Sequence, residues 1–130
     1  MTEPYPFPTS ADEFADKRVL VTGGTRGIGA AEQLTRLVPK GRVVTAFTSI
    51  SSALIRDPAS GEKPTVFTCA GDEAARSIVI ALAKEIGFEG ADAGHLDASR
   101  NIENLGLLVG QLAYGSGFGN RVTLRAYVAS

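Results

Sequence analysis

The chain has 130 residues, enough for one domain with a single buried core, and a formal net charge of −1 at pH 7. Acidic and basic residues are interspersed, so the charge pattern favours neither nucleic acid nor an anionic membrane as a partner. No apolar run approaches the length of a membrane span and no secretory leader is recognisable. We therefore expect a cytoplasmic protein.

The first 14 residues, MTEPYPFPTSADEF, contain Pro4, Pro6 and Pro8, which exclude a helix and predict an extended arm. Residues 15–130 are expected to form a single domain. Short runs rich in β-branched and apolar residues predict strands at 18–22, 42–47 and 65–70, with a weaker strand at 88–94. The tail 121–128 alternates apolar and polar residues, which fits an edge strand, although a helix stays open.

Helices are expected at about 27–38, after Asp72, and through 99–112, with a short helical or irregular piece at 49–57. Asp72 can cap the second of these, and Lys84 with Gly87 can end it. Its buried face is expected to consist of Ile78, Val79, Leu82 and Ile86. Asp97 or Ser99 is expected to cap the last helix, with an apolar side of Ile102, Leu105, Leu108, Val109 and Leu112.

Strands and helices thus alternate along the chain. This order predicts an α/β fold: a short parallel sheet of about four strands with helices on both faces, a three-layer sandwich of the Rossmann type. Ligands of such sheets bind beyond the carboxyl ends of the strands.

The segment TGGTRGIG follows the first predicted strand at that position. Gly23 permits a tight turn, Gly27 lets the backbone approach a pyrophosphate, and Gly29 allows the next helix to pack close to the strand. Amides of the first helical turn would then face the phosphates. The alternative is a glycine-rich turn kept for packing. The predicted dinucleotide site comprises Thr22, Gly23, Gly24, Thr25, Arg26, Gly27, Ile28 and Gly29.

The choice of cofactor follows from charge. The second predicted strand ends in AFTS, residues 46–49, and offers no carboxylate to hold the ribose hydroxyls of NAD. Arg26 could pair with a 2′-phosphate, although a solvated loop charge is an equally open interpretation. NADP(H) is therefore expected in preference to NAD.

The stretch ADEFADKRVLVTGGTRGIGAA resembles the beginning of the short-chain dehydrogenase/reductases. In that family a Tyr followed four residues later by Lys donates the proton. Here Tyr5 and Tyr114 are followed at that spacing by Thr9 and Phe118, and Tyr127 by no residue. The catalytic pair of that family is absent, so catalytic residues cannot be assigned from this resemblance.

From about residue 30 to residue 125 the chain resembles the later half of the NADPH-dependent deazaflavin oxidoreductases. The motifs AFTSI (46–50), CAGDE (69–73), DAGHL (92–96) and SRNIENL (99–105) follow in that family's order. Thr48 and Ser49 replace an Asn and a Thr of its pattern, and His95 replaces a Pro. The resemblance implies that Phe47, Thr48, Ser49 and Ile50 border the nicotinamide and deazaflavin rings. It also implies a fused or shortened Rossmann domain.

Two functions of different class follow. The first is an NADP(H)-dependent oxidoreductase that transfers hydride, or its nucleotide-binding core, with a deazaflavin as a further expected cofactor. The second is a noncatalytic Rossmann-like module that acts through assembly. In either case a homodimer is expected, because a short sheet leaves unpaired edges, with the apolar 105–113 helix containing Gly106 and Gly110 as the preferred contact.

The remaining chemistry-bearing residues give weaker signals. Cys69 lies in an apolar run and is expected to be a packed thiol. His95 could transfer protons at a strand end, but a loop or capping role is expected. With one His and one Cys the sequence shows no metal-ligand spacing, and no metal site is expected.

Overall fold

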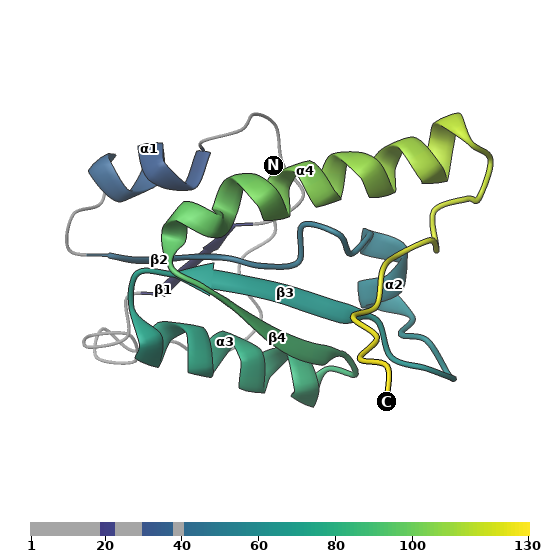
Figure 1. Ribbon diagram of the computed structural model, residues 1–130, viewed down its shortest axis with the longest axis horizontal. Coiled ribbons are helices and arrows are strands. Elements are labelled where there is room, and N and C mark those ends of the chain that lie inside the picture. Colours follow the sequence, from purple (N-terminus) through teal and green to yellow (C-terminus); the bar gives the residue numbers. More distant parts are fainter. Residues whose placement is uncertain (1–18, 23–29, 38–40) are drawn as a thin grey trace, which may run out of the picture.

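A mixed β-sheet with helices on both faces organises the chain (Figure 1). The structure, a computed structural model, describes residues 19–22, 30–37 and 41–130. The strands lie in the order β1-β2-β3-β4 and comprise β1 (Val19–Thr22), β2 (Arg42–Thr45), β3 (Thr65–Ala70) and β4 (Glu89–Gly94). Helix α3 (Glu73–Glu85) covers one face of the sheet, and α4 (Ser99–Gly110) covers the other. The expected arm at residues 1–14 lies outside the described residues.

The α/β class is confirmed, but the expected all-parallel sheet is wrong at one pairing. β1 and β2 are parallel, as are β3 and β4, whereas β2 and β3 are antiparallel. The connection between them, residues 46–64, contains one helix, the five-residue α2 (Ser52–Arg56), and no helix that crosses back along the sheet. The chain therefore reverses at α2, and β3 runs back beside β2 (Figure 1).

The first two elements after β1 differ slightly from expectation. Helix α1 (Ala30–Leu37) lies within the range predicted for it. β2 ends at Thr45, two residues earlier than predicted, and Phe47 then adopts a φ of 59°. A left-handed conformation cannot continue a strand, so the backbone turns away from the sheet at Phe47.

Helix α3 begins and ends as predicted but buries a different face. The Asp72 carboxylate accepts a hydrogen bond of 2.9 Å from the backbone amide of Ala74, and Gly87 takes a φ of 104° just beyond the last turn. The predicted core residues Ile78, Leu82 and Ile86 are instead 53%, 44% and 38% exposed.

Close approach of α3 to the sheet explains this difference. The buried residues of the helix are Ala75, Arg76, Val79 and Ala83. A Cβ at Gly90 of β4 would lie 2.6 Å from Cγ2 of Ile80, so the helix and strand meet where only glycine fits. The face with small side chains allows this approach, and it packs into a core formed by Val44, Ala46, Ile50, Leu54, Val66, Ala70 and Phe88.

The start of α4 also differs from the prediction. Asp97 belongs to the preceding 3₁₀ turn η1 (Leu96–Ala98), and Ala98 occupies the N-cap position without a side-chain hydrogen bond. Ser99 is the first helical residue, and its side chain is fully buried. Neither predicted cap is therefore used. On the apolar side of α4, Ile102 and Val109 are buried, whereas Leu108 is 44% exposed.

The C-terminal tail is neither the edge strand nor the helix considered for it. It runs in an irregular conformation past the start of β3, where the Thr65 amide donates to the Leu124 carbonyl over 3.1 Å. The Ala126 amide in turn donates to Thr65 Oγ1 over 3.0 Å. The tail is thus attached to its own domain by hydrogen bonds that join residues about sixty positions apart.

Candidate functional site

The segments that follow β1 and β2 leave the sheet at the same end. The two strands are parallel, and Thr22 pairs with Thr45 at their last positions. The predicted glycine turn begins directly after Thr22 and the AFTSI segment directly after Thr45. The turn itself, comprising Gly23, Gly24, Thr25, Arg26, Gly27, Ile28 and Gly29, lies outside the described residues, and its resemblance to the short-chain reductases stays a prediction.

The AFTSI segment forms a tight turn around Phe47. The Ile50 amide donates to the Phe47 carbonyl over 3.1 Å, which closes the turn. The Phe47 ring packs edge-on against Phe88 of the core, with ring centroids 6.2 Å apart and an interplanar angle of 82°. A left-handed conformation costs a bulky residue about 1–2 kcal/mol. Packing against Phe88 holds the strained backbone in place, as is common in segments that shape binding sites.

This turn forms part of the wall of a cavity of about 620 Å³. Residues 46–53 line one part of the cavity, and Ile55 of α2 contributes to it. Further walls come from the α4 side and from the tail, with Gly106, Val109, Gly110, Ala113, Tyr114, Asn120 and Val122. None of these described lining residues carries a charge. The cavity therefore suits an uncharged group better than a phosphate.

Two features bring α4 close to the turn. A Cβ at Gly106 would meet the Thr48 methyl group and lie 2.9 Å from the Thr48 carbonyl oxygen, so only glycine fits there. Thr48 Oγ1 is buried and has no hydrogen-bond partner among the described residues. An unsatisfied buried hydroxyl costs about 1–3 kcal/mol, so this position lowers the stability of the turn. The close packing at Gly106 is thus within the chain, not against a second subunit.

The tail holds the far side of the same turn. Thr123 Oγ1 donates to the Ser49 carbonyl over 2.9 Å. The guanidinium of Arg121 donates to the Asp57 carbonyl over 2.9 Å and also pairs with the Asp57 carboxylate. Of the predicted ring-side residues, Ser49 and Ile50 are buried and Phe47 and Thr48 are half-buried. All of them line the cavity together.

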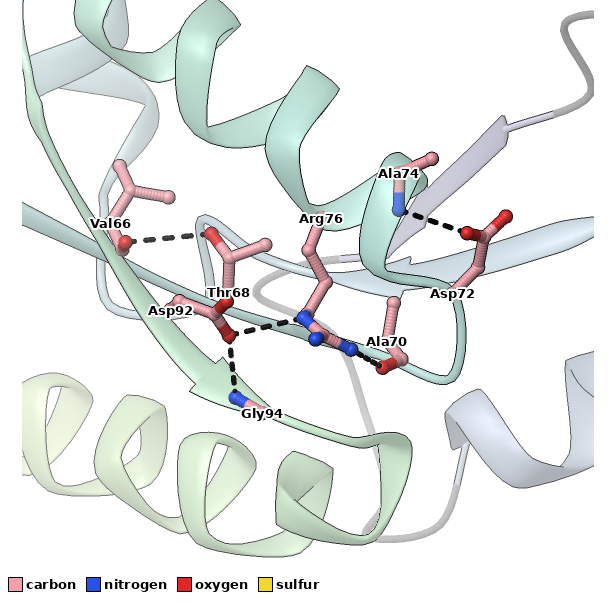
Figure 2. A network of polar contacts seen from close by, with 8 residues as sticks. All are labelled: Val66, Thr68, Ala70, Asp72, Ala74, Arg76, Asp92 and Gly94. Atoms are coloured by element: carbon pink, nitrogen blue, oxygen red, sulfur yellow. Dashed lines mark hydrogen bonds and ion pairs between the residues drawn. The ribbon is translucent and has the colours of Figure 1, made fainter.

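A separate polar network joins α3 to the end of the sheet, as Figure 2 shows. Arg76 is almost fully buried, and its Nη1 donates to the Ala70 carbonyl over 2.7 Å. Its Nε lies 3.1 Å from Asp92 Oδ1 as an ion pair without the alignment of a hydrogen bond. The same Asp92 oxygen accepts from the Gly94 amide over 2.8 Å. Asp72 of the CAGDE motif thus caps α3, and Asp92 of the DAGHL motif pairs with Arg76, so both carboxylates have structural roles here.

Cys69 is fully buried in β3 as a free thiol. Burial removes the hydration that a thiolate needs and raises the pKa of Cys69, while a hydrogen bond with the Thr45 side chain partly opposes this. The group is therefore a neutral thiol at pH 7 and a poor nucleophile. His95 is exposed before η1, and its side chain makes no cap hydrogen bond.

The described residues bring together no group of three or more His, Cys, Asp or Glu side chains that could hold a metal ion. None of their helices is long and apolar enough to cross a membrane. A cytoplasmic location stays a prediction.

Comparison with known proteins agrees with the second resemblance seen in the sequence. Over 97 residues, 72% of this chain, the sequence is 35% identical to the F420-dependent NADP reductase of Methanocaldococcus jannaschii. A crystal structure from Arthrobacter sp. FB24, provisionally assigned as an F420-dependent NADP reductase, matches 75% of this chain with a TM-score of 0.67 and 27% identity. The human metalloreductase STEAP2 is 34% identical over 77 residues, which cover 59% of this chain.

These matches also have limits. The chain covers 44% of the M. jannaschii reductase, 46% of the Arthrobacter structure and 16% of STEAP2. No family model matches the chain. The similarity to F420-dependent NADP reductases is confirmed for part of those proteins, and the activity of the whole reductase is a matter for proposal.

The sequence predicts one wall of the cavity, residues 46–50, through their motif, and does not predict the others. Tyr114 and Asn120 lie in AYGSGFGN, a stretch whose glycines suggest only a flexible connection. An aromatic residue within such a glycine-rich stretch was the available signal.

Proposed function

We propose that this chain is an NADP(H)-dependent oxidoreductase, or the nucleotide-binding core of one, with a deazaflavin as the hydride partner. The observation that carries the proposal is the 35% identity to an F420-dependent NADP reductase across most of the chain. The fold likeness to the Arthrobacter structure supports it. The chain spans less than half of either protein, so a further segment or partner could contribute to the complete activity.

Two properties of the cavity support this assignment. Its described lining is uncharged, and its volume is sufficient for a fused ring system. When bound, NADPH and a deazaflavin supply the hydride donor and acceptor. The work of the chain would be to hold the two rings in register and exclude water, which requires no acid or base. Phe47, Thr48, Ser49 and Ile50 are the proposed ring-side residues.

The phosphates of the dinucleotide are assigned to the glycine turn. β1 and β2 are parallel, and their last residues, Thr22 and Thr45, are paired. A pyrophosphate bound just after Thr22 would therefore lie at the same end of the sheet as the ring-side turn. Gly23, Gly27 and Gly29 would leave backbone amides free for the pyrophosphate. Arg26 would pair with the 2′-phosphate.

Calorimetric titration tests the proposal. NADPH should bind at least about tenfold more tightly than NADH, a difference of about 1.4 kcal/mol. The Arg26→Ala variant should lose most of this preference, whereas Arg36→Ala, which removes an exposed charge on α1, should keep it. Equal affinities for the two dinucleotides would contradict the NADP assignment. No binding of NADPH, NADH or a deazaflavin would contradict the proposed function.

A noncatalytic module that acts by assembly is the second candidate, and exposed apolar side chains favour it. On α4, Leu107 and Leu108 are 62% and 44% exposed, and they lie within the 105–113 face proposed as a homodimer contact. Light scattering should then give twice the 13.5 kDa chain mass. Replacing both leucines with serine should return the protein to a monomer. A wild-type monomer at micromolar concentration would exclude this assembly.

A further inference from the structure

Tyr114 is an exposed aromatic residue at the wall of the cavity. Its side chain is 80% exposed, yet it belongs to the cavity lining. An exposed ring of this size leaves apolar surface in water unless something covers it. Its position is therefore a candidate contact for a ligand, and no ring-side motif of the sequence includes it.

The backbone that carries Tyr114 has an unusual and well-connected geometry. It lies in the π-helical turn η2 (Gln111–Gly115), which continues α4 and closes with a hydrogen bond from the Ser116 amide to the Gln111 carbonyl. Two further amide-to-carbonyl bonds, from Phe118 to Leu112 and from Gly119 to Ala113, fix the chain that follows. Turns of the π type are rare and often lie at functional sites. The backbone is thus fixed while the side chain faces solvent.

The same segment brings a polar group to the cavity. Gly117 and Gly119 have φ angles of 77° and 88°, which glycine tolerates and which turn the chain back so that Asn120 joins the lining. The Asn120 amide can donate and accept hydrogen bonds. Phe47, from the turn after β2, lines the cavity as well. Two aromatic rings and one amide therefore border an uncharged space.

We propose that Tyr114 stacks on a flat nitrogen-containing ring that bears a carbonyl group, with Asn120 hydrogen-bonding to the polar edge of that ring. The reduced nicotinamide of NADPH, with its carboxamide, and a deazaflavin share this chemistry, and the identification of the ring rests on the proposed function. Tyr114 is a binding residue in this proposal, and it transfers no proton.

Titration of ligand parts separates ring binding from phosphate binding. The ligands are NADPH, a deazaflavin, and adenosine 2′,5′-bisphosphate, which keeps the 2′-phosphate but lacks the nicotinamide. Tyr114→Ala should weaken binding of NADPH or of the deazaflavin about tenfold, in the range of aromatic stacking on a base, and leave the bisphosphate unchanged. Tyr114→Phe keeps the ring and should restore wild-type affinity. Tyr127→Ala is the matched control, because Tyr127 is 78% exposed and lies outside the cavity lining.

Tyrosine fluorescence gives a second readout. The chain contains three tyrosines and no tryptophan, so tyrosine emission can be recorded directly. The ring-bearing ligand should quench the emission of the wild-type protein. Tyr114→Phe should bind this ligand with unchanged affinity but lose most of the quenching. Tyr127→Phe should keep the quenching.

The outcomes distinguish the two proposals. Weaker NADPH binding by Tyr114→Ala would assign the nicotinamide to Tyr114, and weaker deazaflavin binding would assign the deazaflavin. If the wild-type protein binds these ligands and Tyr114→Ala binds them equally well, the stacking proposal is overturned and the proposed function stands. If the wild-type protein binds none of them, both are overturned.

Discussion

The contact between α4 and the ring-side turn can be tested by adding one methyl group. In Gly106→Ala the new Cβ would meet the Thr48 methyl group and lie 2.9 Å from the Thr48 carbonyl oxygen, a backbone atom that cannot rotate away. Relieving such overpacking costs about 1–3 kcal/mol. Alanine in place of glycine within a helix returns about 0.8–1 kcal/mol. The net expectation is a loss of about 0–2 kcal/mol in the free energy of unfolding.

Gly110→Ala provides the control on the same helix. A Cβ at Gly110 would have no neighbour within 4 Å, so only the gain in helix propensity of about 1 kcal/mol remains. The two variants should therefore differ by about 1–3 kcal/mol. Urea unfolding, followed by circular dichroism, measures this difference from the midpoints at a common slope. Equal stabilisation by both substitutions would refute the close approach of α4 to Thr48.

Two further predictions concern the β3 end of the sheet. Arg76→Leu should lower the free energy of unfolding by about 2 kcal/mol, because a buried hydrogen bond from a charged group is lost. Arg42→Ala should lower it by less than about 1 kcal/mol, since the ion pair of Arg42 with Asp72 is exposed. Equal losses in urea unfolding would contradict the burial of Arg76. Because the folded state raises the pKa of Cys69, it binds more protons than the unfolded state above about pH 8.5, and stability should fall as pH rises through the folded pKa. Cys69→Ala should lack this part of the decline. Identical profiles of stability against pH for the wild-type protein and Cys69→Ala from pH 7 to 10 would contradict the raised pKa of Cys69.

Local signals predicted the elements better than the way they pair. The capping carboxylate of Asp72 and the left-handed Gly87 act within one turn of chain, and both hold in the structure. The direction of β3 depends on how residues 46–64 fold, and this connection is long enough for β3 to run in either direction beside β2. The predicted buried face of α3 is wrong because α3 packs close to β4 at Gly90, and this contact cannot be predicted from the sequence of the helix alone.

The candidate site shows the same division between local and distant information. Residues 46–50 are adjacent in sequence and were identified together. The remaining walls come from Gly106, Tyr114 and Asn120, about sixty to seventy positions later, and only the folded chain brings them to the same cavity. No periodicity in the sequence links such segments.

The motifs shared with deazaflavin reductases are not equally informative about function. In CAGDE, Asp72 caps α3, and in DAGHL, Asp92 pairs with Arg76, so each can be retained for the fold without any ligand. The AFTSI turn differs, because it has a strained Phe47, leaves the Thr48 hydroxyl unpaired and faces the cavity. A protein that kept only the fold would gain stability by relieving both. Their presence together beside an uncharged cavity is the structural argument for ligand binding over a purely structural module, and it places the decisive experiments at this turn and at Tyr114.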